Sequence, residues 1–427
     1  MSKSGFIIAA TSSGSGKTTL SLGLMHELTR RGFSVQPFKC GPDYIDTQFH
    51  REATGIPSIN LDTFMSSEQH VKDLFKRYAS GKDVAIVEGV MGMFDGYSKM
   101  KGSSAELSRL LSLPVILLIN ATSTAYSVAA TIFGFKNFQP DIKIAGVIFN
   151  RVSSESHFSF LKDACTDAGV ECLGYIKKDN SLVTPSRHLG LTLTAKADME
   201  DFINTAADAV AENVDIETLL RLTELHSQEF DHLPTPPTNT GKVAAVASDE
   251  AFNFIYPANL DRLRMQGYEI VTFSPIHDKS LPKADFVYLP GGYPELFEEE
   301  IAANVSMKNS IREYVEDGGR LWAECGGMIY LSEEIDGFPM CGALPIKCTM
   351  QNAKLTLGYR TICFGDKAIK GHEFHYSHVV NPDSMESVAK QYNARESLVN
   401  TPVYRYKNAI ASYTHLYWAD NDIFKIF

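Results

Sequence analysis

Residues 5–19, "GFIIAATSSGSGKTT", combine an apolar run, a loop of small residues and a Lys-Thr pair. The apolar run predicts a buried strand over 5–10, and the leucine spacing that follows predicts a helix over 17–31. Gly14 and Gly16 allow backbone N–H groups to close around phosphate oxygens at the start of that helix. This order is typical of a phosphate-binding loop, although Thr11 replaces the first glycine of the usual pattern.

The loop residues have distinct expected roles in binding a nucleoside triphosphate. Lys17 is placed to reach the terminal phosphates, and the Thr18 hydroxyl is placed to bind Mg²⁺. The full set that we expect around the nucleotide is Ser13, Gly14, Gly16, Lys17, Thr18 and Thr19.

A carboxylate for the metal follows a second apolar run. The stretch "VEGVMGMFDG" (87–96) places Glu88 at the end of a predicted strand. Ligands of parallel sheets bind at that rim, so we assign Glu88 to Mg²⁺, directly or through water. A surface role for Glu88 stays open, and Asp95 also fits a simple turn before Gly96.

The stretch "FKCGPDYIDTQFH" (38–50) carries two more acids on a loop. Asp43 and Asp46 stand three residues apart after Lys39. A loop with paired carboxylates beside a phosphate loop can bind metal or orient an acceptor. A solvated turn fits the same composition equally well.

The apolar runs indicate two α/β domains. Continuous apolar strands alternate with helical stretches in the N-terminal half, which predicts a parallel sheet covered on both faces. The polar, proline-containing stretch 226–241 shows no periodicity, and we place a linker at 229–241, between domains over 1–228 and 242–427. Strands are predicted at 84–90, 114–120, 144–150, 242–248, 269–275, 284–292 and 320–325, helices at 104–112, 124–135, 254–266 and 305–316, and mostly strands and loops over 345–427.

Cys325 stands at a predicted strand-to-helix junction, between "RLWAEC" and "GGMIYLSEE". A nucleophile on such a turn is exposed at the rim of the sheet, and the helix N-terminus is expected to lower the thiol pKa. Backbone N–H groups at Gly326, and at Gly291 and Gly292 in the loop "LPGGYPE", can hold an oxyanion. The competing interpretation is a buried structural thiol.

A nucleophilic thiol needs a base. The candidates in the same predicted domain are His372, His375 and His415, and spacing alone does not choose among them.

The composition and net charge of the chain narrow the range of possible partners and locations. The formal net charge is −11 with a pI of about 5.6, which argues against a nucleic-acid partner. No apolar run approaches the length of a membrane span. The seven cysteines form no CxxC pair, and we expect a reducing, cytoplasmic location.

Several stretches together resemble the cobyrinate and cobyric acid synthase family of glutamine-dependent amidotransferases, and within it the a,c-diamide synthases. They extend over nearly the whole chain, and "GPDYID" and "GHEFHYS" are specific to that group. The stretches are "TSSGSGKTT", "FKCGPDYID", "VEGVMGMFDG", "TPSRHLGL", "AFNFIYPANL", "LPGGYPE", "AECGGM" and "GHEFHYS".

The resemblance implies an N-terminal P-loop NTPase domain related to dethiobiotin synthetase and a C-terminal class I-type glutamine amidotransferase domain. The implied reaction is ATP- and glutamine-dependent amidation of the a and c side-chain carboxylates of cobyrinic acid, a corrinoid, in cobalamin biosynthesis. Mg²⁺ would accompany ATP.

The family pattern also implies roles for single residues. Cys325 would attack glutamine, with His415 as its base. Thr18, Asp46 and Glu88 would surround the metal, while Asp43, Asp46 and Lys39 would face the acceptor. Further candidates for contacting the macrocycle are His157, His188, His375 and Arg187, for which ordinary loop roles fit equally well.

This chain departs from the sequence patterns of related families at two positions. Ordinary class I amidotransferases carry a Glu two residues after the His, and this chain has Tyr417 there. Related ATPases that share a loop Lys across a dimer have that Lys where this chain has Ser12, which argues against such a shared site.

Other functions remain open at this point. The acceptor could be hydrogenobyrinate, a nickel-sirohydrochlorin or a non-tetrapyrrole acid. The chain could also be a regulatory ATPase with a degenerate amidotransferase-like domain. The oligomeric state, monomer or homodimer, is likewise open.

Overall fold

The computed structural model describes residues 3–182, 193–225 and 240–427. These residues form two compact units, one from 1–63 and 67–233 and the other from 64–66 and 234–427. The predicted linker 229–241 lies almost entirely outside the described residues.

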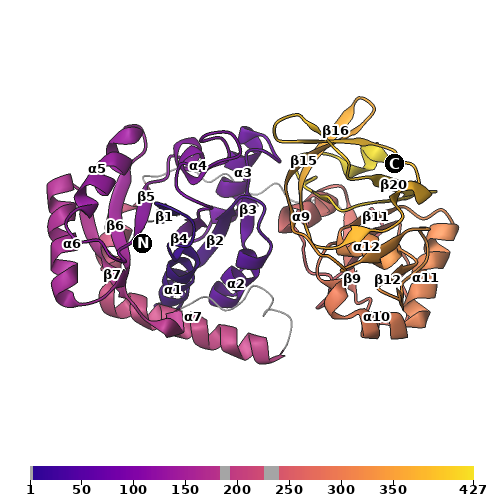
Figure 1. Cartoon of the computed structure of the whole chain (residues 1–427), viewed down its shortest axis with the longest axis horizontal. Coiled ribbons are helices and arrows are strands. Elements are labelled where there is room, and N and C mark those ends of the chain that lie inside the picture. The colour runs from indigo at the N-terminus through magenta and orange to yellow at the C-terminus, as the bar shows by residue number, and fades with distance from the viewer. Residues whose placement is uncertain (1–2, 183–192, 226–239) are drawn as a thin grey trace. The chain divides into compact units, whose positions relative to one another are not determined.

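The first unit is built on a seven-stranded sheet in the order β3-β2-β4-β1-β5-β6-β7 (Figure 1). Every neighbouring pair is parallel, as the continuous apolar runs predict. The strands are β1 (Ser4–Ala10), β2 (Val35–Cys40), β3 (Ile59–Leu61), β4 (Val84–Glu88), β5 (Val115–Asn120), β6 (Ile144–Val152) and β7 (Glu171–Lys177).

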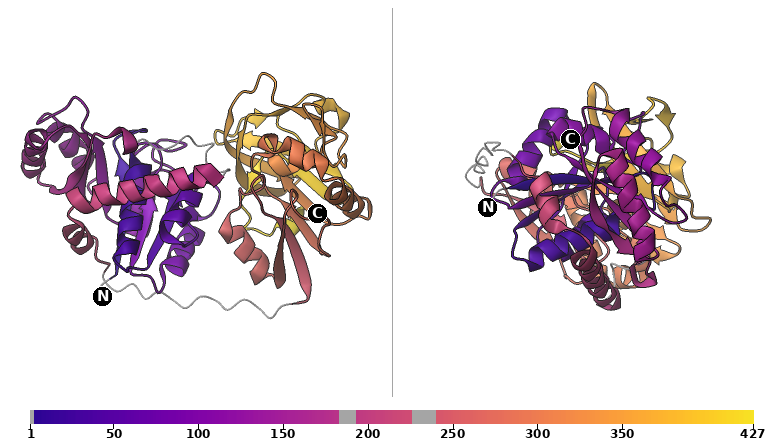
Figure 2. Two further views of the ribbon diagram at one scale, coloured as in Figure 1. Left: turned by 90° about the horizontal axis from the view of Figure 1, so that it is seen from below. Right: turned by 90° about the vertical axis from the view of Figure 1, so that its left-hand side faces the viewer.

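Helices complete the first unit. Apolar side chains of α1 (Lys17–Arg30), α2 (Ile45–Thr54), α7 (Leu193–Asn213) and α8 (Ile216–Leu222) form one core with the central strands. Figure 2 shows the long helix α7 crossing the sheet. The remaining elements are α3 (Glu68–Ala79), α4 (Ser104–Leu111), α5 (Val128–Phe138), α6 (Glu155–Ala168) and the short η1 (Asn180–Leu182).

The order of the strands places the phosphate loop centrally. β1 lies between β4 and β5, and β4 lies between β1 and β2. Because the strands are parallel, the segments that follow β1, β2 and β4 leave the sheet at one edge. The sheet therefore gathers the phosphate loop, the Asp43–Asp46 loop and Glu88 at that edge.

The second unit is built on a six-stranded sheet in the order β20-β21-β11-β10-β8-β9. All pairs are parallel except β20 with β21. The strands are β8 (Lys242–Ala247), β9 (Tyr268–Phe273), β10 (Phe286–Leu289), β11 (Leu321–Glu324), β20 (Val403–Tyr406) and β21 (Ala409–Ser412).

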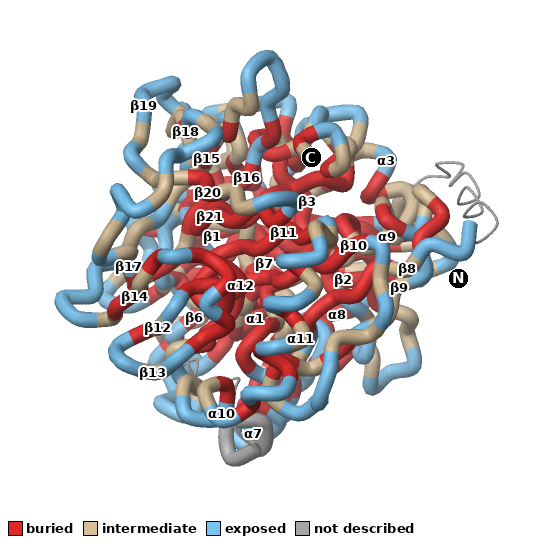
Figure 3. Tube along the Cα trace, turned by 90° about the vertical axis from the view of Figure 1, so that its right-hand side faces the viewer, coloured by how far each residue is buried: buried red, intermediate tan, exposed pale blue. Residues whose placement is uncertain are grey.

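Two different layers cover this sheet. Side chains of α10 (Glu298–Ala303), α11 (Val305–Glu316) and α12 (Gly326–Leu331) pack on one face, and α9 (Pro257–Met265) with part of an antiparallel sheet packs on the other. β10, β11 and α12 lie in the buried interior (Figure 3). The antiparallel sheet, in the order β19-β18-β15-β16-β22, contains β15 (Thr356–Phe364), β16 (Lys367–His375), β18 (Lys390–Asn393), β19 (Leu398–Val399) and β22 (His415–Leu416).

A small fourth sheet and three short 3-10 helices complete the second unit. The sheet has the order β13-β12-β14-β17 and contains β12 (Glu334–Ile335), β13 (Phe338–Pro339), β14 (Lys347–Thr349) and β17 (His378–Val379). The 3-10 helices are η3 (Pro294–Leu296), η4 (Pro382–Ser384) and η5 (Ile423–Ile426). Nowhere in the described parts of the chain is a helix both long and apolar enough to cross a membrane.

Candidate active sites

The phosphate loop joins β1 to α1 and has the backbone that phosphate binding requires. Gly14 and Gly16 have φ values of 71° and 99°, in the left-handed region that favours glycine. A Cβ on Gly16 would lie 2.0 Å from Asn150 Nδ2, which donates to the Ser15 carbonyl at 2.8 Å. Asn150, at the end of the run "IAGVIFN", thus supports the loop, a role that the sequence analysis missed.

Lys17 connects the loop to the segment after β4. Its Nζ donates to the Met91 carbonyl at 2.5 Å, and its side chain is largely buried. Burial, followed by the nearby Lys39 ammonium, lowers the pKa of Lys17. The side chain starts at the first residue of α1, where a terminal phosphate would compete with the Met91 carbonyl for the ammonium.

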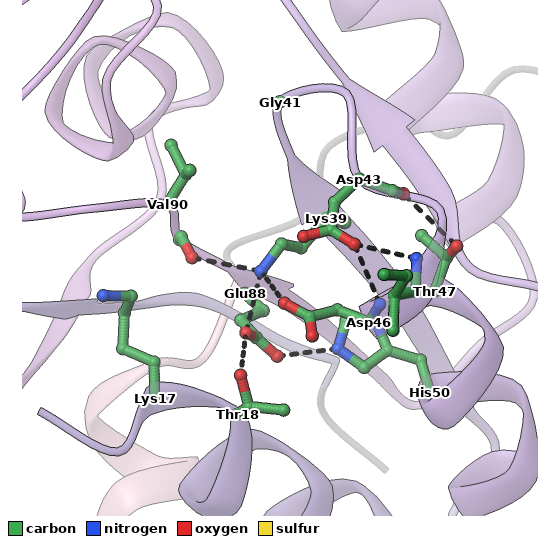
Figure 4. A network of polar contacts seen from close by, with 12 residues as sticks. Lys17, Thr18, Lys39, Gly41, Asp43, Asp46, Thr47, His50, Glu88 and Val90 are labelled. Carbon is green, nitrogen blue, oxygen red and sulfur yellow. Dashed lines mark hydrogen bonds and ion pairs between the residues drawn. The ribbon is translucent and has the colours of Figure 1, made fainter. Parts of the chain in front are cut away.

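Lys39 is the centre of a buried charge network beside the loop (Figure 4). Its Nζ lies 2.5 Å from Asp46 Oδ2 and 2.8 Å from Glu88 Oε1. Burial alone would lower the pKa of Lys39, but attraction to Asp46 and Glu88 raises it overall. Lys39 was predicted to face the acceptor, and the structure places it as a charged bridge between two of the predicted acids.

Glu88 uses both carboxylate oxygens. Oε1 accepts a hydrogen bond from Thr18 Oγ1 at 3.0 Å, and Oε2 lies 2.7 Å from His50 Nε2. Burial raises the pKa of Glu88, but Lys39 and His50 lower it more, so the carboxylate stays ionised. His50 in turn contacts Ser58 Oγ at 2.9 Å, which fixes the ring.

The two loop acids differ in their surroundings. Asp43 Oδ1 accepts hydrogen bonds from the backbone N–H groups of Ile45 and Asp46, at 2.9 Å each, and so caps the start of α2. Burial, followed by repulsion from Asp43, raises the pKa of Asp46. Asp95 accepts from the Gly92 N–H at 3.1 Å, as expected of a turn residue.

The predicted magnesium ligands offer oxygen atoms only. Thr18 Oγ1 and Glu88 Oε1 are adjacent, and Asp46 reaches the same Lys39 ammonium. Mg²⁺ is usually held by one or two carboxylates together with phosphate oxygens and waters, so these donors fit it. No group of three or more His, Cys, Asp or Glu is arranged to hold a metal by protein ligands alone in the described residues, this site included.

In the second unit, Cys325 occupies a sharp turn between β11 and α12. Its φ of 46° and ψ of −104° are rare for a residue with a Cβ. The turn is held by hydrogen bonds from Cys325 N to the Ser412 carbonyl and from Ile329 N to the Cys325 carbonyl. Strained backbone of this kind concentrates at functional sites.

Glycines allow the surrounding backbone to approach the turn. A Cβ on Gly326 would lie 3.2 Å from the Gly292 nitrogen, and one on Gly327 would lie 2.2 Å from the Leu289 carbonyl. The structure therefore brings together Gly292 and Gly326, two of the three predicted oxyanion donors.

The thiol of Cys325 corrects one expectation. Burial, followed by the negative charge of Glu295, raises the pKa of the thiol well above its usual value. The expected lowering by the helix N-terminus is outweighed, since the side chain is buried and the helix is short. A raised pKa favours the protonated form of this thiol.

His415 and this thiol share a neighbour, the Phe374 carbonyl. That carbonyl is 3.8 Å from Cys325 Sγ, and it also acts on the His415 ring, whose pKa it raises slightly. The same ring lies over the third predicted oxyanion donor, because a Cβ on Gly291 would be 2.2 Å from His415 Cε1. Burial, followed by His372 and His375, lowers the pKa of His415, so the ring is neutral and able to accept a proton.

The other two candidate histidines have different partners. His372 Nδ1 lies 3.1 Å from Tyr256 Oη, and its ring stacks on His415 with centroids 5.1 Å apart. The His375 ring stacks on Tyr413 at 3.8 Å, and its Nδ1 contacts the Ser377 carbonyl at 2.8 Å.

His157, another candidate for contacting the macrocycle, has a partner within the first unit. His157 Nε2 contacts the Thr124 carbonyl at 2.6 Å, which ties α6 to the loop after β5. Arg187, His188 and the stretch "TPSRHLGL" lie outside the described residues.

Comparisons with known proteins cover both units. The family model described as CobQ/CobB/MinD/ParA nucleotide binding domain matches residues 6–191, and that of the CobB/CobQ-like glutamine amidotransferase domain matches 243–423. The cobyrinate a,c-diamide synthase of Listeria monocytogenes serotype 4b (strain F2365) is 38% identical, covering 97% of this chain and 96% of its own. Those of Streptococcus sanguinis (strain SK36) and Picrophilus torridus are each 39% identical, covering 98% and 97% of this chain and 96% of their own.

The chain belongs to the cobyrinate a,c-diamide synthase family.

Family membership agrees with the predicted fold class, a P-loop nucleotide-binding domain followed by a glutamine amidotransferase domain. In this member of the cobyrinate a,c-diamide synthase family, buried Tyr417 occupies the position two residues after His415. Its ring packs edge-on against Tyr256, with centroids 5.3 Å apart. Tyr417 is therefore part of the core of the second unit.

Replacing Gly291 with Ala tests the placement of the His415 ring next to Gly291. The new methyl group would collide with the His415 ring, so we expect glutamine hydrolysis to fall by about 100-fold or more, the scale at which a small misplacement of a catalytic group acts. ATP-dependent use of free ammonia should be unchanged. Gly134→Ala, on helix α5, is the control, since a Cβ there meets nothing within 4 Å and the backbone has no positive φ. Normal glutamine hydrolysis by Gly291→Ala would contradict this placement of His415.

Proposed function

We propose that this chain amidates the a and c side-chain carboxylates of cobyrinic acid, using ATP and glutamine. The observation that carries the proposal is full-length similarity to cobyrinate a,c-diamide synthases, combined with two chemically different sites. The first unit supplies a phosphate loop with acidic neighbours, and the second supplies a cysteine on a sharp turn beside a neutral histidine. One site suits carboxylate activation and the other suits release of ammonia.

Glutamine hydrolysis would begin with proton transfer from the Cys325 thiol to His415 as Sγ attacks the side-chain amide carbon. The N–H groups of Gly292 and Gly326 are placed to hold the oxyanion that forms. Ammonia would leave with the proton returned by His415, which produces a thioester. Water, deprotonated by His415, would then release glutamate and restore the thiol.

In the first unit, an acceptor carboxylate would attack the γ-phosphorus of ATP, giving ADP and an acyl phosphate. Lys17 and the N–H groups of the loop would bind the phosphates, and Thr18 and Glu88 would hold Mg²⁺ with support from Asp46. Bound Mg²⁺ would neutralise charge on the phosphate oxygens. Ammonia would then displace phosphate and form the amide, and the second carboxylate would repeat the cycle.

A direct assay tests the proposal. Purified chain would be incubated with ATP, Mg²⁺, glutamine and separate tetrapyrrole acids, and products would be read by mass. We expect two successive losses of about one mass unit from cobyrinic acid, since each step replaces OH by NH₂. The a,c-positions would be assigned by NMR. If hydrogenobyrinate or nickel-sirohydrochlorin is amidated in preference to cobyrinic acid, the reaction is the same but the acceptor is another tetrapyrrole. If no acid is amidated, the proposed function is overturned.

We also propose a cytoplasmic location. All seven cysteines are free thiols, as is usual in a reducing compartment. A homodimer stays the alternative to a monomer, and gel filtration with light scattering distinguishes them.

A further inference from the structure

The proposed base, His415, needs a group that fixes its tautomer. In triads of this kind, an acid accepts the Nδ1 proton, so that Nε2 is free to take a proton from the nucleophile. The usual sequence position of that acid holds Tyr417, which packs in the core. The acid must therefore come from elsewhere in the second unit.

Glu324 directly precedes the nucleophile and is the last residue of β11. The side chains of Glu324 and His415 are both fully buried, and Glu324 Oε2 lies 4.0 Å from His415 Nδ1. Catalytic hydrogen bonds are often long before substrate binds, and this distance needs only about 1 Å of closure. β11 also pairs with β21, and the last residue of β21 lies three residues before His415.

Three donors anchor the carboxylate. Oε1 accepts from the Trp322 indole N–H at 2.7 Å and from the Leu416 backbone N–H at 2.8 Å. Oε2 accepts from the Tyr288 hydroxyl at 2.8 Å and is the oxygen that faces His415. Because Leu416 follows His415, the same carboxylate fixes the backbone and faces the ring of the base.

The energetics are consistent with an acid that serves a reaction step. Burial raises the pKa of Glu324 to about 8, a cost that three hydrogen bonds reduce but do not remove. Burying a carboxylate costs desolvation free energy unless a cation lies beside it. The imidazolium that forms when His415 accepts the thiol proton is such a cation.

We propose that Glu324 is the positioning residue of His415 and takes the place of the acid that class I amidotransferases carry two residues after the histidine. The inference rests on the proposed glutamine hydrolysis. Glu324 accepts the Nδ1 proton in a hydrogen bond, leaves Nε2 as the proton acceptor for Cys325, and stabilises the imidazolium during thioester formation.

Glu324→Gln is the test, measured as glutaminase activity of the full chain. The amide keeps nearly the same shape, but an NH₂ group directed at Nδ1 would favour the tautomer with its proton on Nε2. We expect kcat for glutamine to fall by about 10²- to 10⁴-fold with KM changed less than about threefold, since a wrong tautomer costs up to about 10⁴. Glu324→Asp should recover part of the loss, because a carboxylate is restored at a greater distance.

The controls separate this inference from the function on which it rests. Glu313→Gln, on an exposed position of α11, should behave as wild type. Glu324→Gln should still use free ammonia, which shows that the chain is folded. If wild type hydrolyses no glutamine, the proposed function fails. If wild type hydrolyses it and Glu324→Gln retains full kcat, or loses it with no recovery in Glu324→Asp, the role of Glu324 is overturned.

Discussion

Cys325→Ala is expected to abolish glutamine-dependent amidation while amidation with free ammonia continues. Loss of a catalytic nucleophile costs about 10⁶-fold in kcat in a well-studied hydrolase, so no measurable glutamine hydrolysis should remain. The proposed acceptor site is built from residues of the first unit and would not use the thiol. The measurement is product formation with glutamine, and separately with an ammonium salt at a pH where free ammonia is present.

Cys363→Ala provides a matched control, because this thiol is half-buried on β15 and belongs to neither proposed site. It should retain both activities. If Cys325→Ala loses the ammonia reaction as well while remaining folded, the division of labour between the two sites is wrong.

Lys17→Ala is expected to remove both the glutamine-dependent and the ammonia-dependent reactions. Without the ammonium, the transferred phosphoryl group would lose the positive charge that the phosphate loop supplies. We expect a loss of about 10³-fold or more, the scale of one electrostatic group at a developing charge. Glutamine hydrolysis, measured as glutamate release, tests the same variant at the other site and should persist at a measurable rate.

Lys178→Ala serves as the control for Lys17→Ala, since this side chain is exposed beyond the end of β7. It should amidate at the wild-type rate. Ammonia-dependent product from Lys17→Ala at a rate close to wild type would show that ATP is bound elsewhere.

The sequence predicted features that depend on neighbours along the chain. The strand, loop and helix at 5–30 follow from local periodicity, and the turn at Cys325 follows from a strand pattern meeting two glycines. The predicted helix at 124–135 instead spans Val128–Phe138, because residues 124–127 form turns with bonds three residues apart.

Contacts between distant residues were not predictable in the same way. Asn150 supports the phosphate loop from 135 residues away, and Glu324 faces a histidine from another sheet. No periodic pattern encodes such pairs. The thiol pKa was also mispredicted, because it depends on how much solvent the fold removes, whereas the sequence shows only the nearby helix N-terminus.

The buried, protonated state of Cys325 has a consequence for oxidative stress. Peroxides react with thiolates, and a thiol that is only 4% exposed with a raised pKa presents little of that form to them. Many catalytic cysteines are vulnerable to oxidation because they are thiolates even when no substrate is bound. Here the reactive charge would exist only during attack on the substrate, so the chain should survive aerobic purification and storage with its nucleophile unmodified.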